Sequence, residues 1–227
     1  MSHKISAKIV GHSKTPKGEE LMTYELVFPR YILAEFNTHR EFSRNSASSR
    51  AIPYEKMVEA VKNNTFIPIA WQLPHSGMQG KEYIEEPQTI GYLEKQHMFQ
   101  LNMIIDSTYR MHTNGVTKQI LNRYLEPYAY HKVIMTTSLP GLKNFFSLRC
   151  PNYNHGDKTF YSRKDVIKDI SLDKNYTQKD TEYAQGLSDL EWLKRNSADG
   201  EIHISILAEL MWDAYNESTP DELLEKE

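Results

Sequence analysis

The sequence is poor in cysteine, in net charge and in long apolar runs. Its single cysteine, Cys150, excludes an internal disulfide, and its cysteine and histidines have no zinc-ligand spacing. The formal net charge of −3 comes from 27 basic and 30 acidic side chains, which argues against broad attraction to nucleic acid or to an anionic membrane. No apolar run approaches the roughly 20 residues that span a bilayer, and the first residues lack the apolar core of a signal peptide. We therefore expect a cytoplasmic protein with no metal, no membrane contact and no direct nucleic-acid binding.

The composition is that of a folded domain. Apolar residues make up 39% of the chain, and tyrosine is frequent, with 14 copies. A chain of 227 residues is long enough for one domain with a proper core. We expect a single domain over residues 1–215, followed by an acidic, frayed tail at 216–227.

Apolar periodicity predicts interleaved strands and helices. Alternating or β-branched runs predict strands at 4–10, 21–28 and 130–138, the first two joined by a loop. Helical spacing predicts helices at 54–63, 88–113, 115–127, 141–150 and 201–215, the last with Ile202, Ile206, Leu210 and Ala214 on one face. Residues 30–36 fit either a short helix or a strand. The expected class is α/β.

Residues 151–195 differ from the rest in being polar, rich in tyrosine and densely charged, with a helical patch around 187–195. Their basic and aromatic side chains could grip single-stranded nucleic acid, but their acids nearly balance their bases. We expect this polar insertion to serve as a lid or as a contact between subunits.

The stretch "NTHREFSRNSASSRAIP" at 37–53 reads poorly as either helix or strand. Arg40, Arg44 and Arg50 face only one acid, Glu41, which leaves a local positive excess. Arginine pairs bidentately with phosphate, while serine hydroxyls and the exposed N–H groups of serine-rich turns add further donors. This mixture is typical of a nucleotide phosphate site. A solvated Ser/Arg loop is the alternative, and the spacing alone leaves both open.

The stretch also resembles the signature of the flavin-dependent thymidylate synthases, in which Arg-His-Arg is followed after seven residues by serine. Here Thr38, His39 and Arg40 are followed after seven residues by Ser48. Threonine in place of the first arginine looks like a "Thr-His-Arg" branch of that family. The segments at 68–80, 118–130 and 144–149 are similar to further blocks of the branch, and the similarity resumes at 198 with Asp199 where glutamine is usual.

The resemblance implies a fold and a reaction. The fold is a central, largely antiparallel sheet flanked by helices. The reaction is the methylation of dUMP at C5 to dTMP, with methylenetetrahydrofolate as carbon donor, FAD as hydride carrier and NADPH as reductant. The family works as a homotetramer whose active sites are shared between subunits, and it leaves only a few residues where this chain has its polar insertion.

The resemblance also implies site residues. The dUMP site would be formed by Glu35, Ser46, Ser48, Ser49, Arg50, Arg149 and, from another subunit, Arg123. The FAD contacts would be Thr38, His39, Arg40, Ser138 and Asn144. Arg149 would be the catalytic residue, because a fixed guanidinium against the uracil favours negative charge on the ring. Cys150 follows it directly, but a lone cysteine is more often a small buried hydrophobe than a nucleophile.

Two other functions stay open. Asp199 and the polar insertion are compatible with a different flavin-dependent change to dUMP, such as hydroxymethylation. The loss of the first signature arginine at Thr38 is compatible with a nucleotide-binding protein that has lost flavin and turnover.

Overall fold

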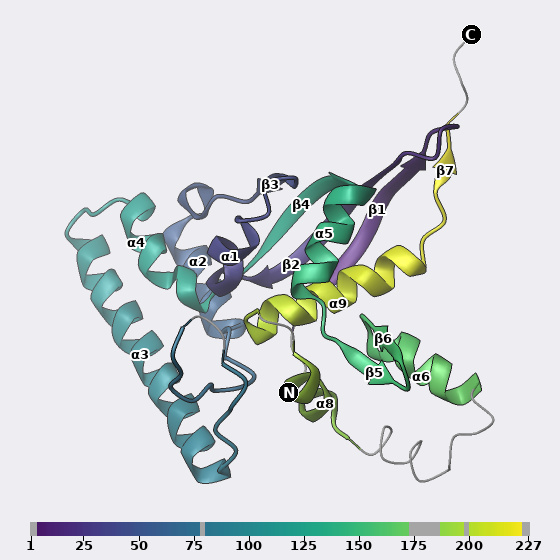
Figure 1. Cartoon of the computed structure of the whole chain (residues 1–227). Helices are drawn as coiled ribbons and strands as arrows, with labels where there is room; N and C mark the ends of the chain where they lie inside the picture. Colours follow the sequence, from purple (N-terminus) through teal and green to yellow (C-terminus); the bar gives the residue numbers. More distant parts are fainter. Residues whose placement is uncertain (1–3, 78–79, 173–186, 198–199, 224–227) are drawn as a thin grey trace.

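The computed structural model describes residues 4–77, 80–172, 187–197 and 200–223 (Figure 1). Its main sheet has five strands in the order β3-β4-β2-β1-β7, and only the β1–β7 pair is parallel. The strands are β1 (Ser6–Lys14), β2 (Glu20–Pro29), β3 (Ser43–Ser46), β4 (Tyr130–Ser138) and β7 (Asp221–Glu222). The predicted α/β class with a largely antiparallel central sheet is therefore confirmed.

The hairpin of β1 and β2 extends further than the sequence pattern predicted. Residues 11–14 and 20, which we assigned to a loop, continue the two strands, and the chain turns within 15–19. Gly18 in the turn has φ +84°, a conformation that favours glycine. The polar His12 belongs to a strand because its side chain is buried and bonds Ser218 and Glu20.

The predicted helices all form, with small shifts in their bounds. They are α2 (Tyr54–Asn63), α3 (Pro87–Thr113), α4 (Lys118–Leu125), α5 (Leu139–Arg149) and α9 (Ile202–Asn216). The ambiguous residues 30–36 form the turn η1 (Arg30–Ile32) and the short helix α1 (Leu33–Phe36). The predicted helix through Pro127 differs: α4 ends at Leu125, and a 3-10 turn, η3 (Glu126–Tyr128), follows because proline has no N–H for the helical ladder.

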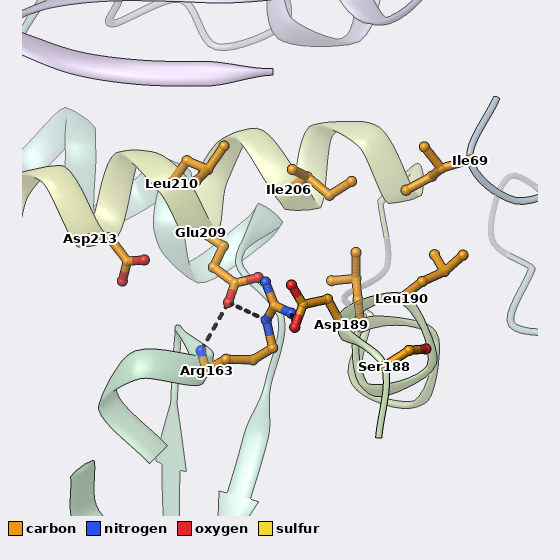
Figure 2. A pocket seen from close by; sticks show the side chains of 10 residues that line it. Ile69, Arg163, Ser188, Asp189, Leu190, Ile206, Glu209, Leu210 and Asp213 are labelled. Carbon is orange, nitrogen blue, oxygen red and sulfur yellow. Dashed lines mark hydrogen bonds and ion pairs between the residues drawn. The ribbon is translucent and has the colours of Figure 1, made fainter. Parts of the chain in front are cut away.

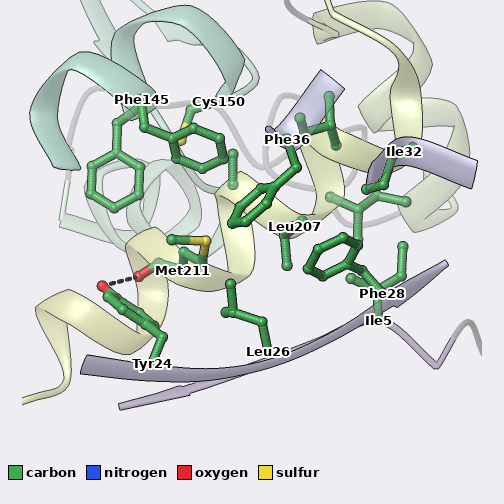
Figure 3. Close-up of a cluster of buried hydrophobic side chains, with 14 of the residues drawn as sticks. Ile5, Tyr24, Leu26, Phe28, Ile32, Phe36, Phe145, Cys150, Leu207 and Met211 are labelled. Atoms are coloured by element: carbon green, nitrogen blue, oxygen red, sulfur yellow. Dashed lines mark hydrogen bonds between the residues drawn. The ribbon is translucent and has the colours of Figure 1, made fainter. Parts of the chain in front are cut away.

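Helices α5 and α9 lie against one face of the sheet (Figure 1). Helices α2, α3 and α4 form a separate layer beyond the end of the sheet where β2 ends and β4 begins. The core joins β2 to both covering helices (Figure 3). Leu26 and Phe28 of β2 are fully buried with Phe145 of α5 and Leu207 of α9. The Tyr24 hydroxyl donates to a backbone carbonyl of α9 at 3.1 Å.

Helix α9 is buried around most of its circumference, so the single apolar face predicted for it is incomplete. Ile202 and Ile206 are buried as expected, but Ile204, Leu207, Ala208 and Met211 are buried as well. The reason is that α9 is covered from two sides: Leu207 and Met211 pack against β2 and α5 (Figure 3), while Ile206 and Glu209 face the polar insertion (Figure 2).

The described parts of the polar insertion are folded onto α9. They comprise β5 (Tyr153–His155), β6 (Lys158–Phe160), α6 (Arg163–Leu172) and α8 (Asp189–Asn196). Glu209 of α9 accepts hydrogen bonds from the Tyr153 hydroxyl at 3.1 Å and from the Arg163 backbone N–H at 2.9 Å. Trp212 of α9 donates to Asp165 at 2.6 Å. These contacts dock the described parts of the insertion against α9.

The acidic tail is also more ordered than predicted. Asp221 and Glu222 pair with Ser13 and Lys14 of β1, and the Leu223 N–H donates to the Lys14 carbonyl at 2.8 Å. The free backbone edge of β1 explains this, since it offers partners that charge patterning does not reveal. Within the described part of the chain, no helix is long and apolar enough to cross a membrane.

Candidate functional site

The stretch at 37–53, here called the signature segment, lies along one face of α5. Gly141, Phe145 and Arg149, spaced four residues apart, form that face. The Phe145 ring meets His39 edge to face, with ring centres 4.7 Å apart. At the other end, a Cβ on Gly141 would lie 2.7 Å from a carboxylate oxygen of Glu41. The segment therefore runs from the last turn of α5 to its first, and its close approach requires glycine at position 141.

Two side chains hold Arg149: His39 of the signature segment and Glu35 of α1, just before it. The Arg149 Nε–H donates to Nε2 of His39 at 3.1 Å, and its Nη1 donates to Glu35 at 2.5 Å. The two partners precede Arg149 by 110 and 114 residues. About four-fifths of the Arg149 side chain is buried. The guanidinium is thus held on two of its three nitrogens, at the partly open end of α5.

The electrostatics of this group follow from its burial. Burial, and then the nearby cations Arg149 and Arg44, lower the pKa of His39 to about 4. Burial also raises the pKa of Glu35, although Arg149 acts against that shift. His39 is therefore neutral near pH 7, and it must carry its proton on Nδ1, because Nε2 accepts from Arg149.

The N-terminus of α9 completes the group, and sequence reasoning did not assign these residues a functional role. Glu201 caps α9, its own N–H bonds Glu35, and its carboxylate contacts Nδ1 of His203 at 2.5 Å. Nε2 of His203 accepts from the Ile69 backbone N–H at 3.1 Å. His203 is fully buried, in agreement with the ordinary core role expected for it. The hydrogen bond between His203 and the Ile69 backbone could not be predicted, because the two residues are 134 positions apart in the sequence.

Gly200, just before this cap, packs closely against the side chain of Arg149. A Cβ on Gly200 would lie 3.2 Å from Nη1 and 3.4 Å from Cδ of Arg149. Asp199, whose replacement of glutamine motivated one of the alternative functions, lies outside the described residues.

A second group of predicted residues forms a turn beside α4. Contrary to expectation, part of the segment is a strand, because β3 (Ser43–Ser46) pairs with β4. The turn η2 (Ser49–Ala51) follows, and the buried Asn122 of α4 donates to the carbonyls of Ser49 at 2.8 Å and Ile52 at 2.9 Å. The backbone of Ser49 is thereby fixed, while Ser46, Ser48 and Arg50 remain exposed on the surface.

The remaining predicted residues are spread over the surface. Arg123, next to Asn122 on α4, is exposed, as are Thr38, Arg40, Ser138 and Asn144. Ser138 precedes α5, and Arg149 ends it, so the 11-residue helix separates them by about 16 Å. One protomer therefore brings Glu35, His39 and Arg149 together but does not gather the whole predicted set around them.

Cys150 has the environment of a packed apolar residue. It is 1% exposed, and burial raises the pKa of its thiol well above the usual range. An activated cysteine needs the opposite shift. The expectation of a small buried hydrophobe is confirmed.

The cavity between α9 and α8, about 500 Å³ in volume, has polar groups that bond one another (Figure 2). Arg163 donates from its backbone N–H and its Nε to Glu209, and its Nη1 is paired with Asp189. Ser188 caps α8. With these partners, the polar groups in its wall hold the polar insertion in place.

Another cavity, of about 600 Å³, lies beside the start of α5. Ser138 and Lys143 line it from the helix side, and Lys17 and Gly18 line it from the β1–β2 turn. Glu19 and Glu20 also line this cavity, so its two lysines face two carboxylates and it has no excess of positive charge.

Comparisons with known proteins identify the fold through two solved structures of one protein. The sequence matches no protein-family model and no curated protein. Among solved structures, the chain shares its fold with PolB, a UMP/dUMP methylase from Streptomyces cacaoi. The structure of PolB bound with 5-bromo-UMP matches with a TM-score of 0.62 at 15% identity, covering 95% of this chain and 90% of that chain. The complex with 5-bromo-dUMP matches with a TM-score of 0.62 at 14% identity, covering 95% and 91%.

Proposed function

We propose that this protein is a flavin-dependent thymidylate synthase that methylates dUMP at C5 to give dTMP. The observation that carries the proposal is the meeting of Arg149 with Glu35 and His39, which lie 114 and 110 residues before it. The family resemblance assigns Arg149 and Glu35 to dUMP and His39 to FAD. The fold shared with a UMP/dUMP methylase supports the same substrate class.

The nucleotide binds to the turn at Ser48–Arg50, with Ser46 beside it. Arg50 is exposed and flexible enough to pair bidentately with the phosphate, and its Nε lies 3.5 Å from the Ser48 hydroxyl. Asn122 fixes the turn from below, which lowers the cost of ordering the site when the ligand arrives. Arg123 lies exposed on the same helix and adds a further cation to the dUMP site of a neighbouring subunit.

Arg149 acts on the uracil ring. A guanidinium held in place and largely shielded from water stabilises negative charge that develops on the ring, which makes C5 a better carbon nucleophile. Glu35 and His39 hold the guanidinium, and Glu35 is partly exposed, so it also reaches the sugar or the ring. No nucleophilic side chain is needed, in keeping with the buried thiol of Cys150.

Bound FAD would supply hydride after reduction by NADPH, with methylenetetrahydrofolate as the carbon donor. The residues proposed to hold it are Thr38, His39, Arg40, Ser138 and Asn144. They fit in part: Arg40, Ser138 and Asn144 are exposed, and Ser138 lines the cavity beside the start of α5. His39 is neutral and bonded to Arg149, so its ring does not act as a cation toward a diphosphate.

The working unit is a homotetramer with shared active sites. Helix α3 supports this part of the proposal, because Tyr92, Phe99 and Met103 on one of its faces are each more than half exposed. Ile120 and Tyr124 on α4 are also exposed. A partner subunit that covers these side chains would place its own cations near the nucleotide turn.

The test is an absorbance spectrum of the purified protein with FAD, recorded before and after addition of NADPH, dUMP and methylenetetrahydrofolate. A bound-flavin spectrum that bleaches with NADPH and recovers only with nucleotide and folate is the expected result. Mass analysis of the product separates methylation from hydroxymethylation, and UMP in place of dUMP tests the sugar. A protein that binds dUMP but no flavin contradicts the proposal and favours the nucleotide binder without turnover.

A further inference from the structure

The hydrogen bond between Arg149 and His39 constrains the proton on the imidazole. A guanidinium has only donors, so Nε2 of His39 must present a lone pair to the Nε–H at 3.1 Å. The ring is 7% exposed and is packed between Phe145, with centres 4.7 Å apart, and Phe42, at 5.7 Å. The packing around the imidazole therefore keeps it from rotating away from Arg149.

The second anchor holds a different nitrogen of the guanidinium. Glu35 accepts from Nη1 at 2.5 Å, so the His39 and Glu35 contacts together fix the plane of the group. Among the described residues no side chain bonds Nη2. This nitrogen therefore lies on the part of the guanidinium that is left for a ligand.

The two anchors differ in what they do to the charge. A carboxylate at Nη1 offsets part of the positive charge of Arg149, whereas a neutral imidazole holds the group without reducing that charge. Burial, Arg149 and then Arg44 disfavour a proton on the imidazole, and the hydrogen bond from Nη1 of Arg44 to the His39 carbonyl at 3.0 Å keeps that charge close to the ring.

We propose that His39 is a positioning residue for Arg149: as a neutral acceptor it orients the guanidinium toward the uracil ring, in place of acting as a charged contact to the flavin. The proposal rests on the proposed function of Arg149. It predicts that the acceptor atom, and not the aromatic ring or its charge, is what the site needs from His39.

The variants His39→Gln and His39→Leu test this requirement. The Gln side chain can place an amide oxygen where Nε2 now lies, whereas Leu fills the space with no acceptor. We expect His39→Leu to lower kcat by roughly 10-fold to 100-fold, the range of a hydrogen bond to a charged group, while KM for dUMP changes less than about threefold. His39→Gln should recover most of kcat.

A matched control is His131→Leu, because His131 is also 7% exposed, packs against a phenylalanine and bonds a backbone carbonyl at 3.1 Å. This change removes a buried histidine away from Arg149, so kcat should stay near the wild-type value even if the melting temperature falls. An equal loss of kcat in the control would overturn the positioning role and leave only a structural one.

Nitrogen NMR on the labelled full-length protein separates the hydrogen bond from the reaction. The Arg149 Nε–H should give a slowly exchanging signal in the wild type and in His39→Gln, but not in His39→Leu, and the His39 Nε2 shift should stay that of an unprotonated acceptor from pH 5.5 to 8. Protonation of His39 in that range, or a rapidly exchanging Nε–H in the wild type, would overturn the proposal. Absence of turnover in a wild type with the expected signals would instead overturn the proposed function.

Discussion

The fully buried side chain of Asn122 donates to the carbonyl of Ser49 at 2.8 Å and so ties α4 to the turn on which the proposed phosphate site is built. The same amide reaches the Ile52 carbonyl at 2.9 Å, so one side chain fixes both ends of the turn. The sequence gives no sign of this role, because an asparagine within a helix usually points to solvent.

Asn122→Ala should loosen the turn and weaken nucleotide binding. It leaves two inward-facing carbonyls without their donor, and we expect a loss of about 2–4 kcal/mol in the free energy of unfolding and roughly tenfold weaker dUMP binding. Urea unfolding and titration calorimetry measure the two effects. Asn102→Ala, at an exposed position of α3, is the control and should change neither. Normal dUMP affinity in Asn122→Ala would show that the turn is not the nucleotide site.

Arg50→Ala should remove the main phosphate contact. We expect dUMP binding to weaken by roughly 1.5–3 kcal/mol, the scale of a hydrogen bond to a charged group. Deoxyuridine, which lacks the phosphate, should bind the variant and the wild type equally, so comparing the two ligands by calorimetry isolates the contact. Arg110→Ala, in an exposed ion pair on α3, is the control. If both nucleosides and nucleotides lose affinity to the same extent, Arg50 does not bind phosphate.

The regular elements were predictable because each shows its own local period. The long helix α3 and the strand β4 follow directly from the spacing of their apolar residues, and both form within a residue or so of the predicted bounds. The exceptions depend on partners far away in the chain. β7 pairs with β1 because β1 offers it an edge, and α9 is buried around most of its surface because the sheet and α5 cover one side and the polar insertion covers another.

The candidate site was predictable in its residue types but not in their pairing. The resemblance assigns Glu35 and Arg149 to dUMP and His39 to FAD, and it gives no indication that the imidazole bonds the guanidinium. Glu201 falls in the segment where the family similarity resumes, and His203 was expected to have an ordinary core or surface role, so neither was assigned to the site. Their connection to Arg149 arises from the packing of α9 against α5.

Gly141→Ala should displace the signature segment from α5. The added Cβ would meet the Thr137 hydroxyl at 2.6 Å and a Glu41 carboxylate oxygen at 2.7 Å, closer than carbon and oxygen approach in proteins. We expect a loss of about 1–3 kcal/mol in the free energy of unfolding, with weaker FAD binding. Gly91→Ala is the matched control, since nothing lies within 4 Å of its added Cβ and alanine favours the helix, so a gain of roughly 0.5–1 kcal/mol is expected. Thermal and urea unfolding compare the two, and equal effects would contradict the close packing.

The stability of the protein should fall as the pH drops from about 6.5 toward 4. Burial lowers the pKa of both His39 and His131 to about 4 in the folded protein, whereas both titrate near 6.5 when unfolded. Between these values the unfolded chain binds more protons, so acid favours unfolding. Each histidine should contribute about 2 kcal/mol to the difference in unfolding free energy between pH 7 and pH 4.5. His131→Leu should make that difference smaller by the same amount, and an unchanged pH dependence would show that the pKa of His131 is the same in the folded and unfolded states.

Glu209→Leu should detach the polar insertion from α9. Glu209 is 5% exposed and accepts three hydrogen bonds, two from Arg163 and one from Tyr153. Without it the only acidic partner left to the Arg163 guanidinium among the described residues is the exposed Asp189, and losing the buried partner costs about 3–5 kcal/mol. Adding Arg163→Leu removes the charge that has lost its buried partner, so the double variant should recover at least half of the loss. Glu217→Gln, in an exposed ion pair with Lys164, should change stability by less than about 1 kcal/mol. Limited proteolysis should then cut Glu209→Leu within the insertion and leave the other two variants intact, and equal resistance in all three would show that Glu209 does not hold the insertion.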